Sequence, residues 1–200
     1  MDDRVARAHA AIDTVNADDP HTIVVHGVER PKEQAHAEMA CAWVRRLVAE
    51  PSDALLVAAR AHHVGRWSLA RDAYPAGRKG YLRWRKALQQ RHAATVRAIL
   101  EAQDWPDAEI ARVEDLVRKR RLGRDAEAQA FEDALCLVFL ETQLAQVADQ
   151  LEDDHTVDVL RKTMKKMSAD ALALAAGLPL DPRGRALLAR AAETAAEETV

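Results

Sequence analysis

Cysteine, glycine, proline and aromatic residues are all scarce in this sequence of 200 residues. It contains two cysteines, seven glycines and seven prolines, and aromatic residues make up 4% of the chain. Because Gly and Pro are few, helical patterns run for long stretches without interruption. Charged residues at 30% and apolar residues at 48% exclude a generally disordered chain. The sequence therefore predicts an all-α fold, and its length favours a single globular helical domain over residues 1–200.

The sequence also lacks the segments that mark exported and membrane proteins. Residues 1–5, MDDRV, have neither the basic end nor the apolar run of a signal peptide. No stretch approaches the roughly 20 apolar residues that span a bilayer. Cys41 and Cys136 lie within apolar helical patterns, a placement typical of buried thiols in a reducing compartment. We therefore expect a cytoplasmic protein with no membrane partner.

Positive charge is concentrated in one stretch of a chain whose formal net charge is -3. Residues 60–92 contain seven Arg and two Lys but a single acid, Asp72, and four aromatic residues are interleaved with them: Trp67, Tyr74, Tyr81 and Trp84. Arg is well suited to phosphate because its guanidinium donates two parallel hydrogen bonds. The stretch therefore predicts an anion-binding segment. The simpler alternative is a solvated helix face whose long side chains cover apolar neighbours.

Apolar periodicity divides the chain into helices. We expect them near residues 5–16, 31–50, 55–63, 78–103, 107–121, 125–151 and 157–167, with a short helix after Ser168 and an irregular connection over residues 18–30. Ser52 and Asp125 are predicted N-caps, whereas Gly65 and Gly123 are predicted stops. The Ala-rich final helix, over residues 181–200, is expected to fray at its end.

Two adjacent histidines lie where the helix before Gly65 ends. Neighbouring side chains on a helix differ by about 100° in direction, so His62 and His63 can serve one site only at a helix end. Together with His36 and Asp133 they would form a mixed nitrogen and oxygen shell for a divalent metal, which could be Mn, Fe, Zn or Mg. The alternative is that each histidine is a solvated or capping residue.

Polar residues open the most apolar helix of the chain. Five residues recur there at steps of three or four and therefore share a face, namely Gln129, Glu132, Asp133, Cys136 and Leu140. Because an unpaired carboxylate is costly to bury, Glu132 and Asp133 are candidates for catalysis, with Glu132 orienting or deprotonating water. Two structural alternatives remain open. The acids could be solvated and favoured by the helix dipole, or they could form a buried ion bridge with Arg60 or Arg66.

Four segments carry a resemblance to a known family over most of the chain. They are RAHHVGRW at residues 60–67, YP followed by RKGYLRWR at residues 74–85, QAFEDALCLVFL at residues 129–140 and RKTMKKM at residues 161–167. In these segments the chain resembles the family called domain of unknown function 4202, which implies no particular activity. The residues that fit the family pattern are His63, Arg66, Arg78, Arg85, Lys119, Gln129, Glu132, Asp133 and Lys162, whereas the position of His62 is commonly Gln.

A shorter resemblance is to the HD-domain phosphohydrolases. In that family a helix with His, a helix ending in His-Asp before a Gly, and a later helix with Asp supply the metal ligands. His36, the doublet His62-His63 before Gly65, and Asp133 occur here in that order, with His63 in place of the Asp. The resemblance implies an HD-like fold in which His36, His62, His63 and Asp133 hold the metal. If the Gln-His pair common in the first family at positions 62 and 63 is instead the functional pattern, the site would bind a nucleotide or another phosphorylated ligand without a metal.

Together these residues predict a metal-dependent phosphohydrolase that acts on a nucleotide or another small phosphorylated molecule. Its catalytic residues would be Glu132 and Asp133, and its substrate-binding residues would be Arg66, Arg78, Arg85, Lys119 and Gln129. Two other functions remain open, a non-catalytic regulatory module that binds a nucleotide or an acidic partner and an iron oxygenase on an HD scaffold. The negative net charge and the lack of a groove-reading motif disfavour nucleic acid. A homodimer remains open.

Overall fold

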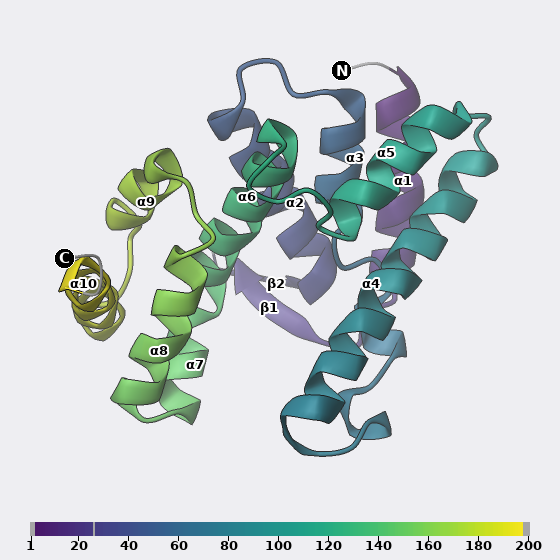
Figure 1. The fold of residues 1–200 in the computed structure, drawn as a ribbon. Coiled ribbons are helices and arrows are strands. Elements are labelled where there is room, and N and C mark those ends of the chain that lie inside the picture. The colour runs from purple at the N-terminus through teal and green to yellow at the C-terminus, as the bar shows by residue number, and fades with distance from the viewer. Residues whose placement is uncertain (1–2, 26, 198–200) are drawn as a thin grey trace. The chain divides into compact units, whose positions relative to one another are not determined.

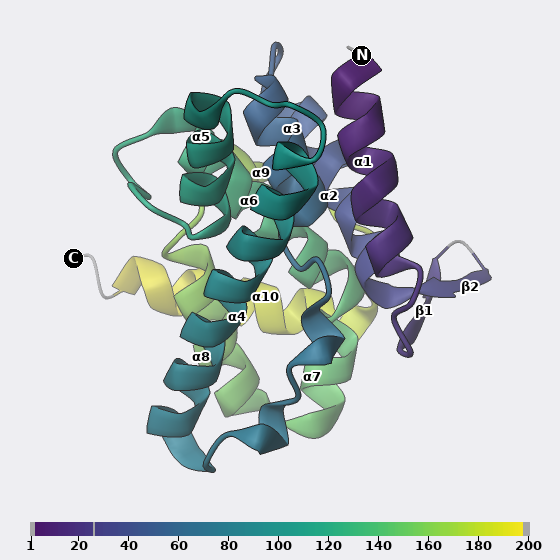
Figure 2. The same ribbon diagram turned by 90° about the vertical axis from the view of Figure 1, so that its right-hand side faces the viewer.

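The chain folds predominantly into α-helices, which confirms the predicted class. The computed structural model describes residues 3–25 and 27–197 (Figures 1 and 2). Within the chain there are two compact units, Met1–Phe131 and Glu132–Val200. The single domain expected from the length stays a prediction. No helix in the described ranges is both long and apolar enough to cross a membrane.

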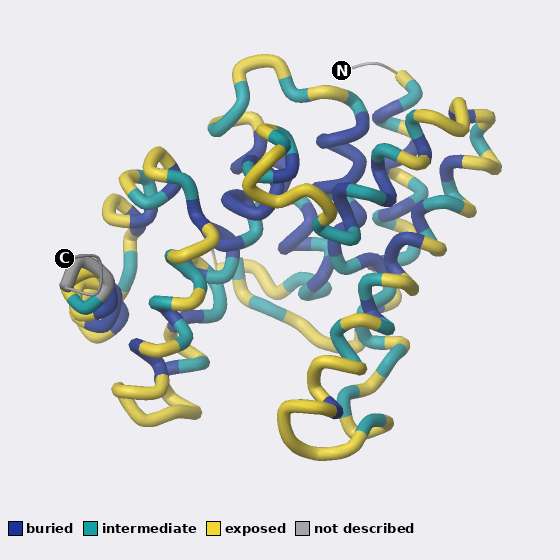
Figure 3. The backbone as a smooth tube through the Cα atoms, viewed as in Figure 1, coloured by how far each residue is buried: buried dark blue, intermediate teal, exposed yellow. Residues whose placement is uncertain are grey.

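The first unit is built around a short apolar helix. Its helices are α1 (Asp3–Asn16), α2 (Lys32–Leu47), α3 (Asp53–Ala61), α4 (Gly77–Glu101), α5 (Asp107–Val117) and the start of α6 (Ala126–Thr142). Helix α3 packs against α1, α2 and α5, and α4 packs against α5. Apolar residues cover α3 on nearly every side, and it is buried along most of its length (Figure 3). The prediction that this helix is a central element is therefore confirmed.

A β-hairpin replaces the irregular connection expected over residues 18–30. Strand β1 (Thr22–Val25) pairs antiparallel with β2 (Val28–Pro31), in the register Thr22 to Pro31. The prediction was wrong here because β1 consists of four β-branched residues, which favour strands, and Gly27 supplies a positive φ of 80° in the turn. The hairpin leads directly into α2, and Lys32 N–H donates to the carbonyl of His21 at 2.8 Å.

The segment between α3 and α4 is hydrogen-bonded to α1 and to α4, from which Trp84 Nε1 donates to the carbonyl of Leu69 at 2.9 Å. Helix α3 ends at Ala61, before the predicted stop at Gly65, whose φ is 63° and whose N–H donates to Asn16 Oδ1 at 3.2 Å. Two short 3₁₀ helices follow, η1 (Arg66–Ser68) and η2 (Arg71–Ala73). The Arg71 guanidinium donates to the carbonyls of Tyr74 at 3.0 Å and Pro75 at 3.1 Å. These bonds hold the turn from which α4 begins.

The second unit contains the remainder of α6 and the helices α7 (Leu144–Gln150), α8 (Asp153–Met164), α9 (Ala169–Ala176) and α10 (Pro182–Glu197). Helix α10 packs against α8 and α7. The prediction of one helix over residues 125–151 was wrong, because the helix is interrupted at Gln143, whose φ is -122°. Next to this break the Thr142 hydroxyl donates to the carbonyl of Val138 at 2.7 Å, a bond of the kind that distorts helices. The fraying expected at residues 198–200 lies outside the described residues.

Both predicted N-caps, Ser52 and Asp125, are confirmed, and Ser168 caps a third helix. Ser52 Oγ accepts the N–H of Leu55 at 3.1 Å at the start of α3. Asp125 Oδ1 accepts the N–H of Ala128 at 3.0 Å at the start of α6, and the Ser168 hydroxyl caps α9. These side chains satisfy backbone donors that the first turn of a helix leaves without partners, so the local sequence determines where each helix begins.

Candidate metal centre and cationic groove

Three side chains of the first unit bring metal-ligating atoms together. One donor atom each from Glu33, His36 and His63 lies within 4.8 Å of the other two. Glu33 Oε2 is 3.0 Å from His63 Nδ1 and 3.6 Å from His36 Nδ1. Around a metal with ligand bonds of about 2.1 Å, adjacent ligand atoms are about 3.0 to 3.4 Å apart. The cluster therefore fits a divalent cation after small side-chain adjustments.

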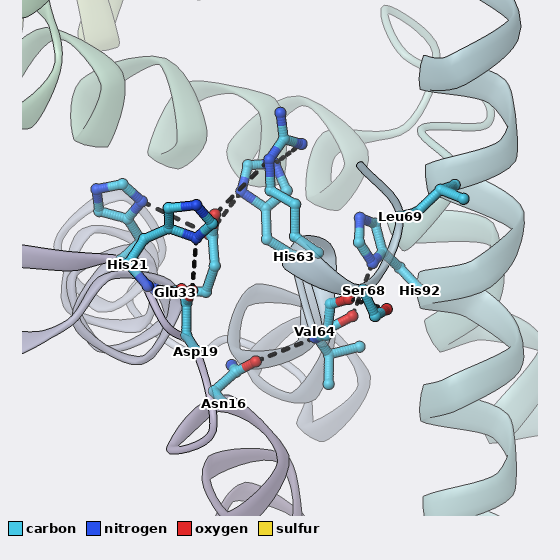
Figure 4. A network of polar contacts seen from close by, with 12 residues as sticks. Asn16, Asp19, His21, Glu33, His63, Val64, Ser68, Leu69 and His92 are labelled. Carbon is cyan, nitrogen blue, oxygen red and sulfur yellow. Dashed lines mark hydrogen bonds and ion pairs between the residues drawn. The ribbon is translucent and has the colours of Figure 1, made fainter. Parts of the chain in front are cut away.

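Two different elements supply these ligands. Glu33 and His36 are three residues apart at the start of α2, so both side chains lie on one face of the helix. His63 follows the end of α3, where the turn toward Gly65 directs its ring to Glu33 (Figure 4). The ligand set thus depends on the packing of α2 against α3, which are neighbours in the core.

The protonation states of the cluster suit metal binding. Burial opposes ionisation of Glu33, but the imidazoles of His63 and His36 outweigh it, so the pKa of Glu33 lies well below its usual value. Burial also lowers the pKa of His63, although Glu33 opposes this effect. A charged carboxylate and a neutral imidazole are the forms that bind a metal. The site therefore needs to release few protons when a metal binds.

Asp19 and His21 lie next to this cluster. The Asp19 side chain is 1% exposed, and its Oδ1 accepts the N–H of His21 at 2.9 Å and faces the ring Nδ1 at 3.0 Å. Its Oδ2 accepts the N–H of Glu33 at 3.0 Å (Figure 4). Asp19 therefore ties the segment before the hairpin to the first turn of α2, from which Glu33 extends.

An open groove of about 920 Å³ adjoins Glu33. Lys32, Arg66 and Arg71 contribute cations to its lining, and three aromatic residues contribute apolar surface: Trp67, Tyr74 and Trp84. Arg66 Nε is 3.7 Å from Glu33 Oε1, and its guanidinium lies 4.9 Å from the ring centre of Trp84. The volume is that of a site for a small ligand. Glu33 and Asp72 also line the groove, so its lining has one net positive charge, which favours an anionic ligand.

The comparison with known proteins gives one match. The model of a family described as Domain of unknown function (DUF4202) matches residues 6–188. The chain belongs to this family. No curated protein and no solved structure matches it. The DUF4202 match includes the metal-ligating cluster and the groove, and it confirms the first of the two resemblances. The resemblance to HD-domain phosphohydrolases stays a prediction.

The predicted ligand set and the cluster in this DUF4202 chain overlap in His36 and His63. His62 is buried, and its Nδ1–H donates to the carbonyl of Ala59 at 2.9 Å, while its ring centre lies 4.3 Å from that of His63. Burial holds the pKa of His62 well below its usual value. Asp133 belongs to the second unit, where its Oδ1 accepts the N–H of Ser168 at 2.8 Å. The roles of His62 and Asp133 as ligands stay predictions.

The predicted substrate-binding and catalytic residues occupy several places. Arg66 lines the groove. Arg78 is exposed in the first turn of α4, and the guanidinium of Arg85 lies 5.8 Å from the ring centre of Tyr81. The others lie in two segments. Lys119 follows α5 with a φ of 56°, whereas Gln129 and Glu132 lie in α6, where Glu132 is buried with its Oε1 3.7 Å from Lys166 Nζ. Apart from Arg66, these assignments find no support in the groove and stay predictions.

Sequence reasoning missed four residues of the site: Asp19, His21, Lys32 and Glu33. A local signal existed for Glu33, because Glu and His three residues apart in a helix place two ligands on one face, a spacing used in helical metal sites. No local signal pointed to Asp19 or His21, which were assigned to an irregular connection. His92 was noted only as part of the basic stretch. Its Nδ1–H donates to the carbonyl of Val64 at 2.8 Å, which ties the residue after His63 to α4.

Proposed function

We propose that this chain is a metal-dependent hydrolase of small phosphorylated molecules, with Glu33, His36 and His63 as ligands of a divalent metal. The observation that carries the proposal is the convergence of these three side chains beside a cationic groove. Two imidazoles and one carboxylate form the protein ligand set of several catalytic zinc and iron sites, where they leave positions open for water or substrate. Mixed nitrogen and oxygen ligands suit Zn, Fe or Mn better than Mg.

The residues around the cluster have distinct roles in this proposal. Arg66 is within reach of the metal ligands, since its Nη1 is 3.5 Å from His63 Nε2, and it would bind the phosphate and neutralise its developing charge. Lys32 would add a second positive charge from the rim of the groove. Trp84 and Tyr74 would contact the less polar part of the substrate, such as a nucleoside. A bound metal would supply a water molecule of lowered pKa.

We also propose a cytoplasmic location. Cys41 and Cys136 are both buried thiols, as expected for a protein in a reducing compartment. Neither belongs to the metal-ligating cluster of the described residues. Burial raises the pKa of Cys41 to about 11, which keeps that thiol protonated and unreactive.

The proposal can be tested by metal analysis of purified protein after equilibration with Mn, Zn or Fe(II). We expect close to one metal ion per chain, and at least a tenfold weaker affinity in Glu33→Gln and His63→Ala. His9→Gln is the matched control, because His9 is also buried in the first unit but lies outside the cluster and bonds the carbonyl of Leu56 through Nε2. Unchanged metal binding in both cluster variants would refute the assignment.

Phosphate release from a panel of nucleotides and p-nitrophenyl phosphate then tests the reaction. We expect turnover that needs the metal and falls at least a hundredfold in Arg66→Ala. If the metal binds and nucleotides raise the melting temperature without turnover, the non-catalytic regulatory module replaces the hydrolase. The ligand set also matches that of iron oxygenases. Selective retention of iron with visible absorption would favour that second candidate.

A further inference from the structure

Helix α4 has an unusual distribution of charge. Between Asp72 and Glu101 the sequence contains no acid but seven cations: Arg78, Lys79, Arg83, Arg85, Lys86, Arg91 and Arg97. Exposed residues dominate the helix as far as Arg91, whereas its second half packs into the core through residues such as Val96 and Leu100. The basic half of the helix is therefore largely a surface element (Figure 1).

Three of these cations form a stripe on one side of α4. Lys79, Arg83 and Lys86 follow one another at steps of four and three residues, and all three are exposed. At about 100° per residue they lie between about 100° and 160° around the helix from Trp84, which lines the groove. This stripe, here called the basic stripe, is therefore separate from the metal-ligating cluster and its groove.

The charges of the basic stripe have no local compensation. In the described part of the chain no carboxylate pairs with Lys79, Arg83 or Lys86, whereas Arg97 on the same helix contacts Glu101 and Glu114. Like charges three or four residues apart repel one another on a helix, and a cation in the first turn opposes the helix dipole. The first turn of α4 contains no acid, unlike those of α5 and α8. An external anion would relieve this repulsion.

The charges of the chain are distributed unevenly over its surface. Arginines elsewhere in the first unit are neutralised in ion pairs, including Arg30 with Glu38, Arg60 with Asp13, and Arg112 with Asp125. Uncompensated positive charge is therefore concentrated on α4 although the whole chain is acidic. The net charge, which disfavoured nucleic acid at the level of sequence, does not describe the surface that a polyanion would meet.

We infer that the basic stripe of α4 binds the phosphodiester backbone of single-stranded nucleic acid. A row of cations without acids matches a backbone with a negative charge at every nucleotide, and such contacts need no groove-reading motif. Leu82, which is 52% exposed, lies within about 100° of all three cations around the helix and adds apolar surface beside them. This inference is independent of the proposed hydrolase activity.

Fluorescence anisotropy with labelled 20-nucleotide single-stranded RNA and DNA tests the inference, with the full chain at 50 to 200 mM KCl. The test variant combines Lys79→Glu, Arg83→Glu and Lys86→Glu. The control combines Arg46→Glu, Arg121→Glu and Arg124→Glu, which changes the net charge equally at exposed positions outside α4. We expect at least tenfold weaker binding for the test variant and at most threefold for the control. The slope of log affinity against log salt should become shallower by about two.

Three results would overturn the inference. They are the absence of binding by the natural chain at 50 mM KCl, an equal loss of affinity in both triple variants, and a preference for a 20-residue polyglutamate peptide, which would indicate an acidic protein partner. Circular dichroism checks that the variants fold. If the test variant does not, Lys79→Gln with Lys86→Gln replaces it, and the slope should then fall by about 1.4. Metal content should be unchanged in every α4 variant, so this test and that of the hydrolase fail separately.

Discussion

The buried carboxylate of Asp19 accepts a hydrogen bond from the backbone N–H of Glu33 at 3.0 Å. The two residues are fourteen positions apart and are separated by the β-hairpin. Because Glu33 occupies the first turn of α2, this bond satisfies a donor that the helix itself leaves without a partner. It also holds the backbone of Glu33 in place, from which the side-chain carboxylate extends to His63.

Replacing Asp19 by Ala should therefore weaken both the fold and the metal centre. Loss of the cap and of a buried acceptor should lower the free energy of unfolding by about 2 kcal/mol. Metal affinity should fall about tenfold, as is typical when a residue that orients a ligand is removed. Urea unfolding and metal titration measure the two effects. Asp19→Asn keeps one acceptor oxygen and should lose less of both, and equal stability of Asp19→Ala and the natural chain would contradict this role.

The ion pair between Arg60 and Asp13 should contribute measurably to stability. Arg60 is 12% exposed, and its Nε donates to Asp13 Oδ1 at 2.6 Å, joining α3 to α1. Arg60→Met should lower the free energy of unfolding by about 2 kcal/mol, because Asp13 loses a charged partner in a partly buried place. The control is Arg7→Met, whose pair with Asp3 is largely exposed and should contribute under about 0.5 kcal/mol. A similar loss of unfolding free energy in both variants would show that the Arg60 pair contributes no more than the exposed Arg7 pair.

Lowering the pH below about 6.5 should destabilise the metal-free protein before its carboxylates become protonated. Burial lowers the pKa of His9 to about 4 and that of His92 to about 3, so both stay neutral in the folded chain when the unfolded chain takes up protons below about pH 6.5. Stability is thus fully present above pH 6.5 and falls as the pH decreases. Each histidine contributes up to about 1.4 kcal/mol per pH unit.

Urea unfolding at pH 7.5, 6.5 and 5.5, with a chelator present, measures this dependence. His9→Asn and His92→Asn should each flatten the decrease between pH 6.5 and 5.5, even if they lower the stability at pH 7.5. A decrease of the same steepness in both variants would show that other groups cause it.

Gly80 should tolerate no side chain. A Cβ at this position would lie 1.8 Å from the carbonyl oxygen of Pro75, a backbone atom of the turn that Arg71 holds. Gly80→Ala should therefore displace the turn before α4, lower the free energy of unfolding by about 1 to 3 kcal/mol and speed up proteolysis within residues 66–76. Gly177→Ala, where the nearest atom is 3.6 Å away, should change stability little. Equal resistance of both variants to protease would contradict the prediction.

The fold class and most helices could be predicted because their signals are local. Ser52, Asp125 and Ser168 begin helices through bonds to amides three residues ahead, and α3 is apolar on nearly all sides. The hairpin was missed although Thr22 to Val25 are all β-branched, because the run is only four residues long. The interruption at Gln143 has no strong breaker such as Gly or Pro.

By itself, the sequence determined that the chain is helical, that His36 and His63 are candidate ligands, and that positive charge gathers between residues 60 and 92. Only the tertiary structure decided that Glu33 joins these histidines. Its carboxylate contacts His63, which is 30 residues away in the sequence. This contact depends on how α2 packs against α3 and on the buried hydrogen bond to Asp19. Likewise, only the fold divides the cations between Arg66 in the groove and the basic stripe of α4, because that division depends on which side of each helix remains exposed.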